Sequence, residues 1–142
     1  MTTAMGGRFD AGTPREKSVP LRVLVVDGNA DTAEGMAMYF ELEGLEARVA
    51  LTGAEAYRIA PAFQPQLVLV EVWLPDADGW DVIRRLRQLP QTANATLVAI
   101  ADHGDVQARD RAIASGCDFH LARPFDLDQL RWIAAERVRQ QH

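Results

Sequence analysis

The sequence is poor in cysteine, and Cys117 is the single thiol among 142 residues. One cysteine cannot form an intramolecular disulfide, so we expect the reducing setting of the cytoplasm. A catalytic thiol is the alternative to the interpretation that we favour, a small buried or half-buried packing residue. The sequence also lacks an apolar run long enough to span a membrane, and it lacks the apolar segment of a signal peptide. We therefore expect a cytoplasmic protein that makes no use of a membrane.

Lysine is equally scarce, because Lys17 is the only one in the chain. The remaining positive charge comes from arginine, and the net charge is −5. A mildly acidic chain with scattered arginines argues against a nucleic-acid surface as the main function. The one arginine cluster, formed by Arg84, Arg85 and Arg87, is interpreted as the solvated face of a helix.

Residues 1–20 lack apolar periodicity and contain three glycines and two prolines. Such a composition buries too little apolar surface to offset the entropy cost of ordering the chain. The sequence therefore predicts a flexible tail over residues 1–20 and one domain over residues 21–142.

Within that domain, short apolar runs alternate with stretches of helical periodicity. Strands are predicted over residues 21–26, 46–50, 67–71, 96–100 and 118–121. The first helix is predicted to begin at a capping-box-like Asp31 with Glu34 and to stop at Gly44. The other helices are predicted over residues 54–60, ended by Pro61, and over 80–89, 106–115 and 127–139. Apolar strands joined by helical crossovers predict a parallel sheet with helices on both faces.

Ligands and chemistry in such a sheet belong at the carboxyl ends of the strands. Asp27 follows the first predicted strand, Glu71 ends the third, Ala101 and Asp102 follow the fourth, and Arg123 follows the last. Two carboxylates and one cation are therefore predicted to converge at this edge.

Residues 21–139 resemble the receiver domain of two-component response regulators. The residues that carry the resemblance are Val23-Leu24-Val25-Val26-Asp27, Leu74-Pro75, Asp78-Gly79, Gly116 and Arg123-Pro124-Phe125. The resemblance implies a flavodoxin-like α/β fold with strand order 2-1-3-4-5, and a cis peptide bond before Pro124.

An active receiver uses two adjacent acids that hold Mg²⁺, an aspartate that accepts a phosphoryl group, a Ser or Thr, and a lysine. By this resemblance the first acid is Asp27, but the second acid is replaced by Gly28. The acceptor position holds Glu71, the hydroxyl position Ala101 and the lysine position Arg123. We therefore expect a degenerate site in which Mg²⁺ binding is weak or absent, with Asp27 and Glu71 as weak metal candidates.

Two other acids, Asp76 and Asp78, lie near the acceptor position, and we interpret them as turn-forming and helix-capping residues. Glu71 is longer than an aspartate by about 1.3 Å, one methylene, and in the family this substitution is sometimes a mimic of phosphorylation. The mimic is imperfect, because a carboxylate carries about one charge and a phosphoryl group about −1.5 to −2. The aromatic position that responds to the phosphate in the family holds His120. We expect it to be a surface histidine, with a pH sensor as the alternative.

The guanidinium of Arg123 has the planar fork that binds a carboxylate through two nitrogens. We hypothesise that Arg123 pairs with Glu71 or Asp27 and holds the site in one state; the alternative is an arginine turned to solvent. Trp80 is predicted to pack at a helix start, whereas Trp73 is either an exposed contact residue or a cap on the core. Trp132, Phe119 and Phe125 lie in or near the face of the fourth helix, fifth strand and fifth helix, which the family uses for dimerisation and output. We expect them simply to pack the last helix, with a role in that face as the alternative.

These features predict a stand-alone, degenerate receiver that is not an enzyme and acts by binding proteins without phosphorylation. Its partner would be a histidine kinase, a phosphotransfer protein, another regulator, or a second copy through the face named above. One alternative is a conventional phosphoacceptor, modified by a histidine kinase at Glu71 or a nearby aspartate. A flavodoxin-like enzyme is the third class, but no phosphate loop follows the first strand and no G-x-S-x-G motif is present. No cofactor is expected.

Overall fold

The computed structural model describes residues 19–141. Apart from Val19 and Pro20, the predicted tail lies outside the described residues. The strands are β1 (Arg22–Val26), β2 (Glu46–Ala50), β3 (Leu67–Glu71), β4 (Thr96–Asp102) and β5 (Phe119–Arg123). The helices are α1 (Ala30–Leu42), α2 (Gly53–Phe63), α3 (Gly79–Gln88), α4 (Ala108–Ser115) and α5 (Leu127–Gln140).

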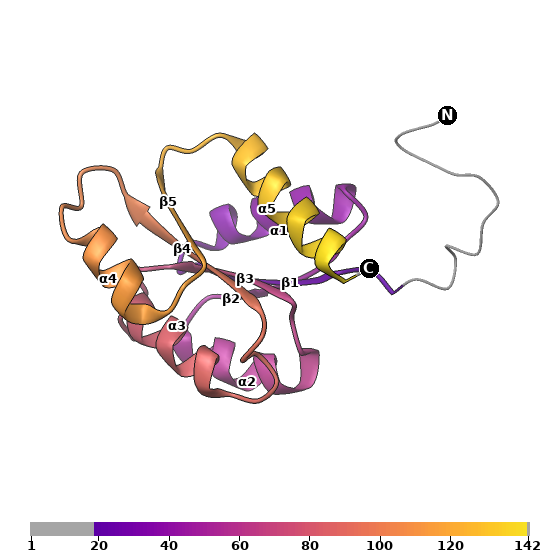
Figure 1. Ribbon diagram of the computed structural model, residues 1–142, viewed down its shortest axis with the longest axis horizontal. Coiled ribbons are helices and arrows are strands. Elements are labelled where there is room, and N and C mark those ends of the chain that lie inside the picture. Colours follow the sequence, from indigo (N-terminus) through magenta and orange to yellow (C-terminus); the bar gives the residue numbers. More distant parts are fainter. Residues whose placement is uncertain (1–18, 142) are drawn as a thin grey trace.

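The five strands form one parallel sheet in the order β2-β1-β3-β4-β5. Helices lie on both sides of it, with α1 and α5 on one side and α2, α3 and α4 on the other (Figure 1). The flavodoxin-like α/β fold, its strand order and its two helical layers are therefore confirmed. No helix in the described part of the chain is both long enough and apolar enough to cross a membrane.

Alternation along the strands builds two separate cores, because successive side chains point to opposite faces of a sheet. One set packs beneath α2, α3 and α4 and includes Leu24, Val26, Val68, Val70, Leu97, Ala99 and Ala101. The other set packs beneath α1 and α5 and includes Val23, Val25, Leu67, Leu69, Val98, Ile100 and Leu121. Burial on both faces explains why the strands read as continuous apolar runs.

The predicted end of the second helix at Pro61 is wrong. The helix α2 continues through Pro61 to Phe63 and ends at Gln64, which takes a left-handed conformation with φ of 51°. The Gln64 N–H donates to the carbonyl of Ala60 at 2.8 Å. A proline removes one helical hydrogen bond, and here only Ala62 and Phe63 follow it, so little of the helix depends on the missing donor.

The predicted helix starts also need correction. The cap of α1 is Asn29 rather than Asp31, because its side-chain oxygen accepts the Thr32 N–H at 2.9 Å. Likewise α4 begins at Ala108 instead of Val106, which precedes the helix and is almost fully exposed. A capping side chain therefore marks the start of α1, whereas Gln107 makes no side-chain cap at the start of α4.

The last two strands extend further than predicted at their carboxyl ends. Ala101 and Asp102 belong to β4, and Arg123 belongs to β5. The pairing continues because Ala101 and Asp102 lie opposite Ala122 and Arg123 in the sheet. The fifth strand begins one residue later than predicted, at Phe119, and the side chain of Asp118 accepts the Leu97 N–H at 2.8 Å.

Candidate functional site

Strand alternation brings the predicted site residues to one side of the sheet. Asp27 stands two positions after Val25, Glu71 two after Leu69, and Arg123 two after Leu121. These preceding residues all pack on the α1 and α5 side, so the three polar side chains share that side. Because the strands are parallel, the three side chains also share the carboxyl edge.

Arg123 contacts both carboxylates at once. Its Nη2 lies 2.9 Å from Oδ2 of Asp27, and its Nη1 donates to Oε2 of Glu71. In the strand order, β4 lies between β5 and β3, and β3 lies between β4 and β1. The long arginine side chain therefore reaches across one strand to Glu71 and across two to Asp27. The pairing hypothesised from the sequence is present, with both candidate partners engaged rather than one.

The two acids are deeply buried, whereas the base is not. The side chains of Asp27 and Glu71 are 6 % and 8 % exposed, and that of Arg123 is 30 % exposed. A buried carboxylate is costly without a partner of opposite charge or hydrogen-bond donors. The guanidinium therefore supplies the opposite charge that two buried carboxylates need.

The remaining oxygens of the two acids bind backbone donors. Oδ1 of Asp27 accepts the Asn29 N–H at 2.9 Å, and Oε1 of Glu71 accepts the Trp73 N–H at 3.4 Å. Each carboxylate thus divides its oxygens between the guanidinium and the loop that follows its own strand. The site links the β1–α1 loop, the β3–α3 loop and β5.

The position of the missing second acid is closed by a neighbouring loop. A Cβ atom added to Gly28 would lie 2.8 Å from Cδ of Pro75, a distance that forces the loop to shift. Gly79 is more confined still, because an added Cβ would lie 2.4 Å from the carbonyl oxygen of Glu71. These two glycines let the β1–α1 loop and the start of α3 pack directly against the residues that surround Glu71.

The residues present do not fit the Mg²⁺ site that the family resemblance implies. Mg²⁺ needs near-octahedral oxygen coordination, but Gly28 contributes no side-chain oxygen. Asp27 and Glu71 each direct one oxygen at Arg123. Across residues 19–141, the structure brings together no group of three or more His, Cys, Asp or Glu side chains that could hold a metal ion.

The two positions associated with a phosphate response are separate from this site. Ala101 is fully buried in the core beneath α2, α3 and α4. His120 is exposed on β5, which is the surface position expected for it. Within residues 19–141, no hydrogen bond or ion pair joins either side chain to Arg123 or Glu71.

The alternative acceptors, Asp76 and Asp78, act as helix caps, as the sequence interpretation proposed. Asp76 accepts the N–H groups of Gly53 and Ala54 at 2.8 and 3.1 Å, at the start of α2. These backbone donors hold the pKa of the Asp76 carboxyl below its usual value. Asp78 caps α3 by accepting the Trp80 N–H at 2.9 Å.

The aromatic residues separate into packing and surface roles. Trp80 is buried, which confirms its predicted packing role, whereas the side chain of Trp73 is largely exposed beside Glu71. The core-capping alternative for Trp73 is therefore wrong. Trp132 is also exposed and contacts Phe119 edge to face, with ring centroids 5.8 Å apart.

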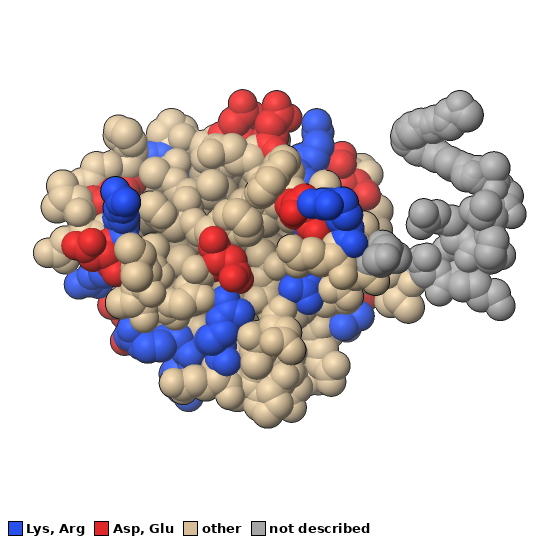
Figure 2. All heavy atoms as spheres, in the orientation of Figure 1, with Lys and Arg blue, Asp and Glu red and all other residues tan. Residues whose placement is uncertain are grey.

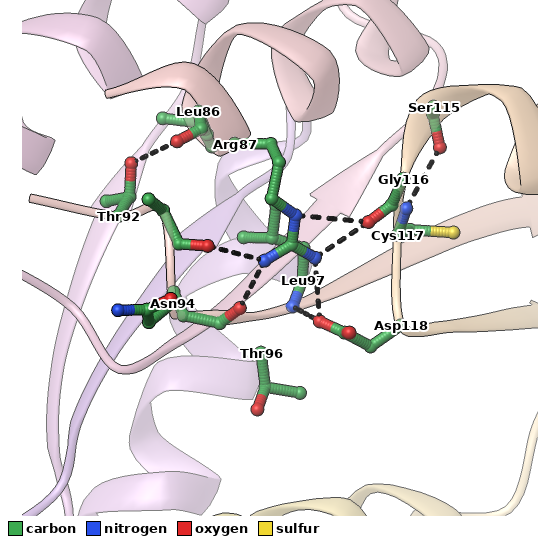
Figure 3. A network of polar contacts seen from close by, with 12 residues as sticks. Leu86, Arg87, Thr92, Asn94, Thr96, Leu97, Ser115, Gly116, Cys117 and Asp118 are labelled. Atoms are coloured by element: carbon green, nitrogen blue, oxygen red, sulfur yellow. Dashed lines mark hydrogen bonds and ion pairs between the residues drawn. The ribbon is translucent and has the colours of Figure 1, made fainter. Parts of the chain in front are cut away.

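Sequence reasoning missed one polar network, which lies at the opposite end of β4 and β5. Figure 3 shows the guanidinium of Arg87 enclosed by the residues before β4 and β5. It donates to the carbonyls of Ala93, Ala95 and Gly116 and pairs with Asp118 at 2.8 Å. The prediction of a solvated arginine face is therefore wrong for Arg87. Arg87 lies at helical spacing from Trp80 and Ile83, which places it beside the buried side of α3. That spacing could have predicted that Arg87 is not fully solvated.

Comparison with known proteins gives a consistent result. The family model described as the response regulator receiver domain matches residues 23–135. The DNA-binding dual master transcriptional regulator RpaA of Synechocystis is 28 % identical over 109 residues, covering 77 % of this chain and 45 % of RpaA. An uncharacterized 14.6 kDa protein of Leptolyngbya boryana is 31 % identical, covering 73 % of this chain and 79 % of that protein.

Solved structures agree with the sequence comparisons. The crystal structure of a putative response regulator from Chloroflexus aurantiacus has a TM-score of 0.77 and 28 % identity, covering 84 % of this chain and 98 % of that one. This chain spans just under half the length of several curated regulators that it matches.

Proposed function

Because this chain belongs to the response regulator receiver domain family of two-component signalling, we propose that it is a degenerate receiver that acts by binding proteins, without being phosphorylated. The observation that carries this proposal is the contact of Arg123 with both Asp27 and Glu71. A carboxylate held by a guanidinium and a backbone N–H has few free lone pairs with which to attack phosphorus.

The chemistry of phosphoryl transfer supports the same proposal. Transfer depends on positioning and on neutralisation of the phosphoryl charge by metal and cation. Here the cation is already bound to two acids, the hydroxyl position is the buried Ala101, and Gly28 offers no metal ligand. The conventional alternative, phosphorylation at Glu71, Asp76 or Asp78, would require the acceptor to leave the contacts described above.

The binding surface that we propose lies over α4, β5 and α5. Its exposed apolar side chains include Ile113, Leu127 and Trp132. A hollow of about 450 Å³ beside Trp132 is lined by Phe119, His120 and Ile133 among others. On the face shown in Figure 2, uncharged atoms cover a broad area between separate acidic and basic groups. A surface with large exposed apolar residues suits a protein partner.

The partner that we propose is a histidine kinase, a phosphotransfer protein, another regulator, or a second copy of this domain on the same face. We also propose that the domain itself has no enzymatic activity and contacts neither nucleic acid nor membrane. A net charge of −5 opposes binding to both phosphate backbones and anionic lipid.

A pull-down from native-cell lysate tests this proposal. The wild-type protein is compared with Glu71→Asp and Trp132→Ala, each with and without prior treatment with a small phosphodonor and Mg²⁺. We expect the wild type and Glu71→Asp to recover the same partners in equal amounts under both treatments, and Trp132→Ala to lose them. Recovery that appears only after phosphodonor treatment would contradict the proposal.

A further inference from the structure

A hollow of about 340 Å³ lies between α1 and α5, at the edge of the sheet where the strands begin. Both helices cover the same side of the sheet (Figure 1). The apolar walls of the hollow are formed by Tyr39, Phe40, Leu45, Ala134 and Val138. Ligand pockets in proteins occupy about 300–1,000 Å³ and are lined mostly by apolar side chains. The hollow is therefore large enough for a small organic molecule.

One polar atom of these walls has no partner. The hydroxyl oxygen of Tyr39 is buried, and among residues 19–141 it is the one buried side-chain nitrogen or oxygen atom that makes no hydrogen bond. A buried hydroxyl without a hydrogen bond lowers stability, and a phenylalanine would pack here without that loss. The Tyr39 hydroxyl is therefore a buried donor that lacks an acceptor.

The cation closest to this hydroxyl is Arg131, which also lines the hollow. The oxygen of Tyr39 raises the pKa of the Arg131 guanidinium, which places the two groups close together, although no hydrogen bond of normal geometry joins them in the described part of the chain. The ion pairs of Arg131 with Glu43 at 3.8 Å and with Asp128 at 3.4 Å are long and exposed, so they hold the guanidinium weakly. A carboxylate accepts hydrogen bonds from a hydroxyl and a guanidinium together.

From these contacts we propose that the hollow between α1 and α5 binds a small organic acid with an apolar body, whose carboxylate accepts from the Tyr39 hydroxyl and from Arg131. The apolar body packs against Phe40 and Val138. The carboxylate takes the place of Glu43 on Arg131, and Glu43, which is 42 % exposed, turns to water. The hollow lies at the other edge of the sheet from the Asp27, Glu71 and Arg123 cluster, so this inference does not rest on the proposed function.

Titration of the whole isotope-labelled chain with sodium octanoate, followed by NMR of the backbone amides, tests this inference. We expect saturable shifts confined to the amides around the hollow, including those of Leu45, Ala135 and Val138. Octanamide keeps the apolar chain and an acceptor oxygen but lacks the charge. It should bind the wild type at least about tenfold more weakly than octanoate.

Three variants separate the parts of the proposed site. Tyr39→Phe removes only the hydroxyl and should weaken octanoate binding at least about tenfold. Arg131→Gln should remove the preference for octanoate over octanamide, and Ala135→Leu, a change at an exposed position of the wall, should block binding by filling the hollow. The matched control is Tyr57→Phe, because Tyr57 is the other tyrosine of the chain and packs on the opposite side of the sheet. It should bind octanoate as the wild type does.

The absence of saturable shifts in the wild type would overturn the inference, as would equal octanoate affinity of the wild type and Tyr39→Phe. The same spectra show whether each variant is folded. Overhauser contacts in the free protein from Val138 to residues 1–18, or to a second copy of the chain, would also overturn the inference, because they would make that segment or that copy the occupant of the hollow.

Discussion

Arg123 and Asp27 stand 96 residues apart in the sequence and are joined by an ion pair of 2.9 Å between Nη2 and Oδ2. The same guanidinium contacts Glu71. One side chain of β5 therefore connects the ends of β1 and β3 across the intervening β4, at the edge where parallel sheets carry their chemistry. The three side chains therefore form one cluster of ion pairs at this edge of the sheet.

We predict that Arg123→Ala lowers the free energy of unfolding by about 3–5 kcal/mol, because it leaves two buried acids without their cation. Urea denaturation at neutral pH measures this loss. Arg111→Ala, which breaks an exposed pair, should cost no more than about 1 kcal/mol. Equal losses for the two variants would show that the Arg123 contacts do not carry the stability assigned to them.

Gly28→Ala is predicted to destabilise the domain by about 1–3 kcal/mol through the clash with Pro75. Adding Pro75→Ala should restore part of that loss, which a double-mutant cycle detects. Gly79→Ala should cost more than Gly28→Ala, because its clash is with backbone atoms of Glu71 and Val72.

The matched control for these glycines is Gly35, which lies within α1 and has open space around it. Gly35→Ala should stabilise the domain by up to about 1 kcal/mol, because alanine favours the helix. If Gly28→Ala stabilised the domain in the same way, the close approach of Pro75 would be refuted.

Arg87→Ala is predicted to lower the free energy of unfolding by on the order of 3 kcal/mol. The change removes charged hydrogen bonds to three carbonyls and the ion pair with Asp118. Arg84→Ala is the control, because Arg84 is exposed and pairs only with Asp81 among the ion pairs of the described residues. Its effect should stay within about 0.5 kcal/mol. Thermal unfolding of both variants beside the wild type measures the difference.

Burial raises the pKa of the Cys117 thiol above its ordinary value. The raised pKa favours the protonated thiol in the folded protein. The thiol's contribution to stability is therefore complete below the pKa that it has in the unfolded chain, and it is lost as the pH rises through the pKa that it has in the folded protein. Only the thiolate is alkylated, so iodoacetamide at pH 8 should modify the folded protein at least about tenfold more slowly than the urea-unfolded protein. Equal rates, followed by intact mass, would show that the thiol is not shielded.

Much of the fold was predictable because its pattern is local. Val25, Leu69 and Leu121 lie in apolar runs whose alternation sets the side of the sheet on which Asp27, Glu71 and Arg123 emerge. The convergence of two acids and one arginine followed from strand ends alone, and Asp76 and Asp78 behaved as the caps that their turn context indicated.

The features that were not predictable depend on contacts between distant segments. Nothing in the sequence around Gly28 indicates that Pro75 lies against it, because loop approach is set by the packing of β1, β3 and α3 together. The local cost of a proline predicts a helix end at Pro61, yet Gln64 supplies the actual stop three residues later. Arg87 looked like part of a charged run, and its carbonyl partners come from two other segments of the chain.

Incubation of the wild-type protein with acetyl phosphate and Mg²⁺, followed by intact mass spectrometry, tests the central claim most directly. The closed arrangement of Arg123, Asp27 and Glu71 predicts no stable adduct on the wild type, and none on Glu71→Asp, because that change restores neither the metal ligand nor the lysine. A stable gain of about 80 Da on the wild type, the mass of one phosphoryl group, would contradict the account.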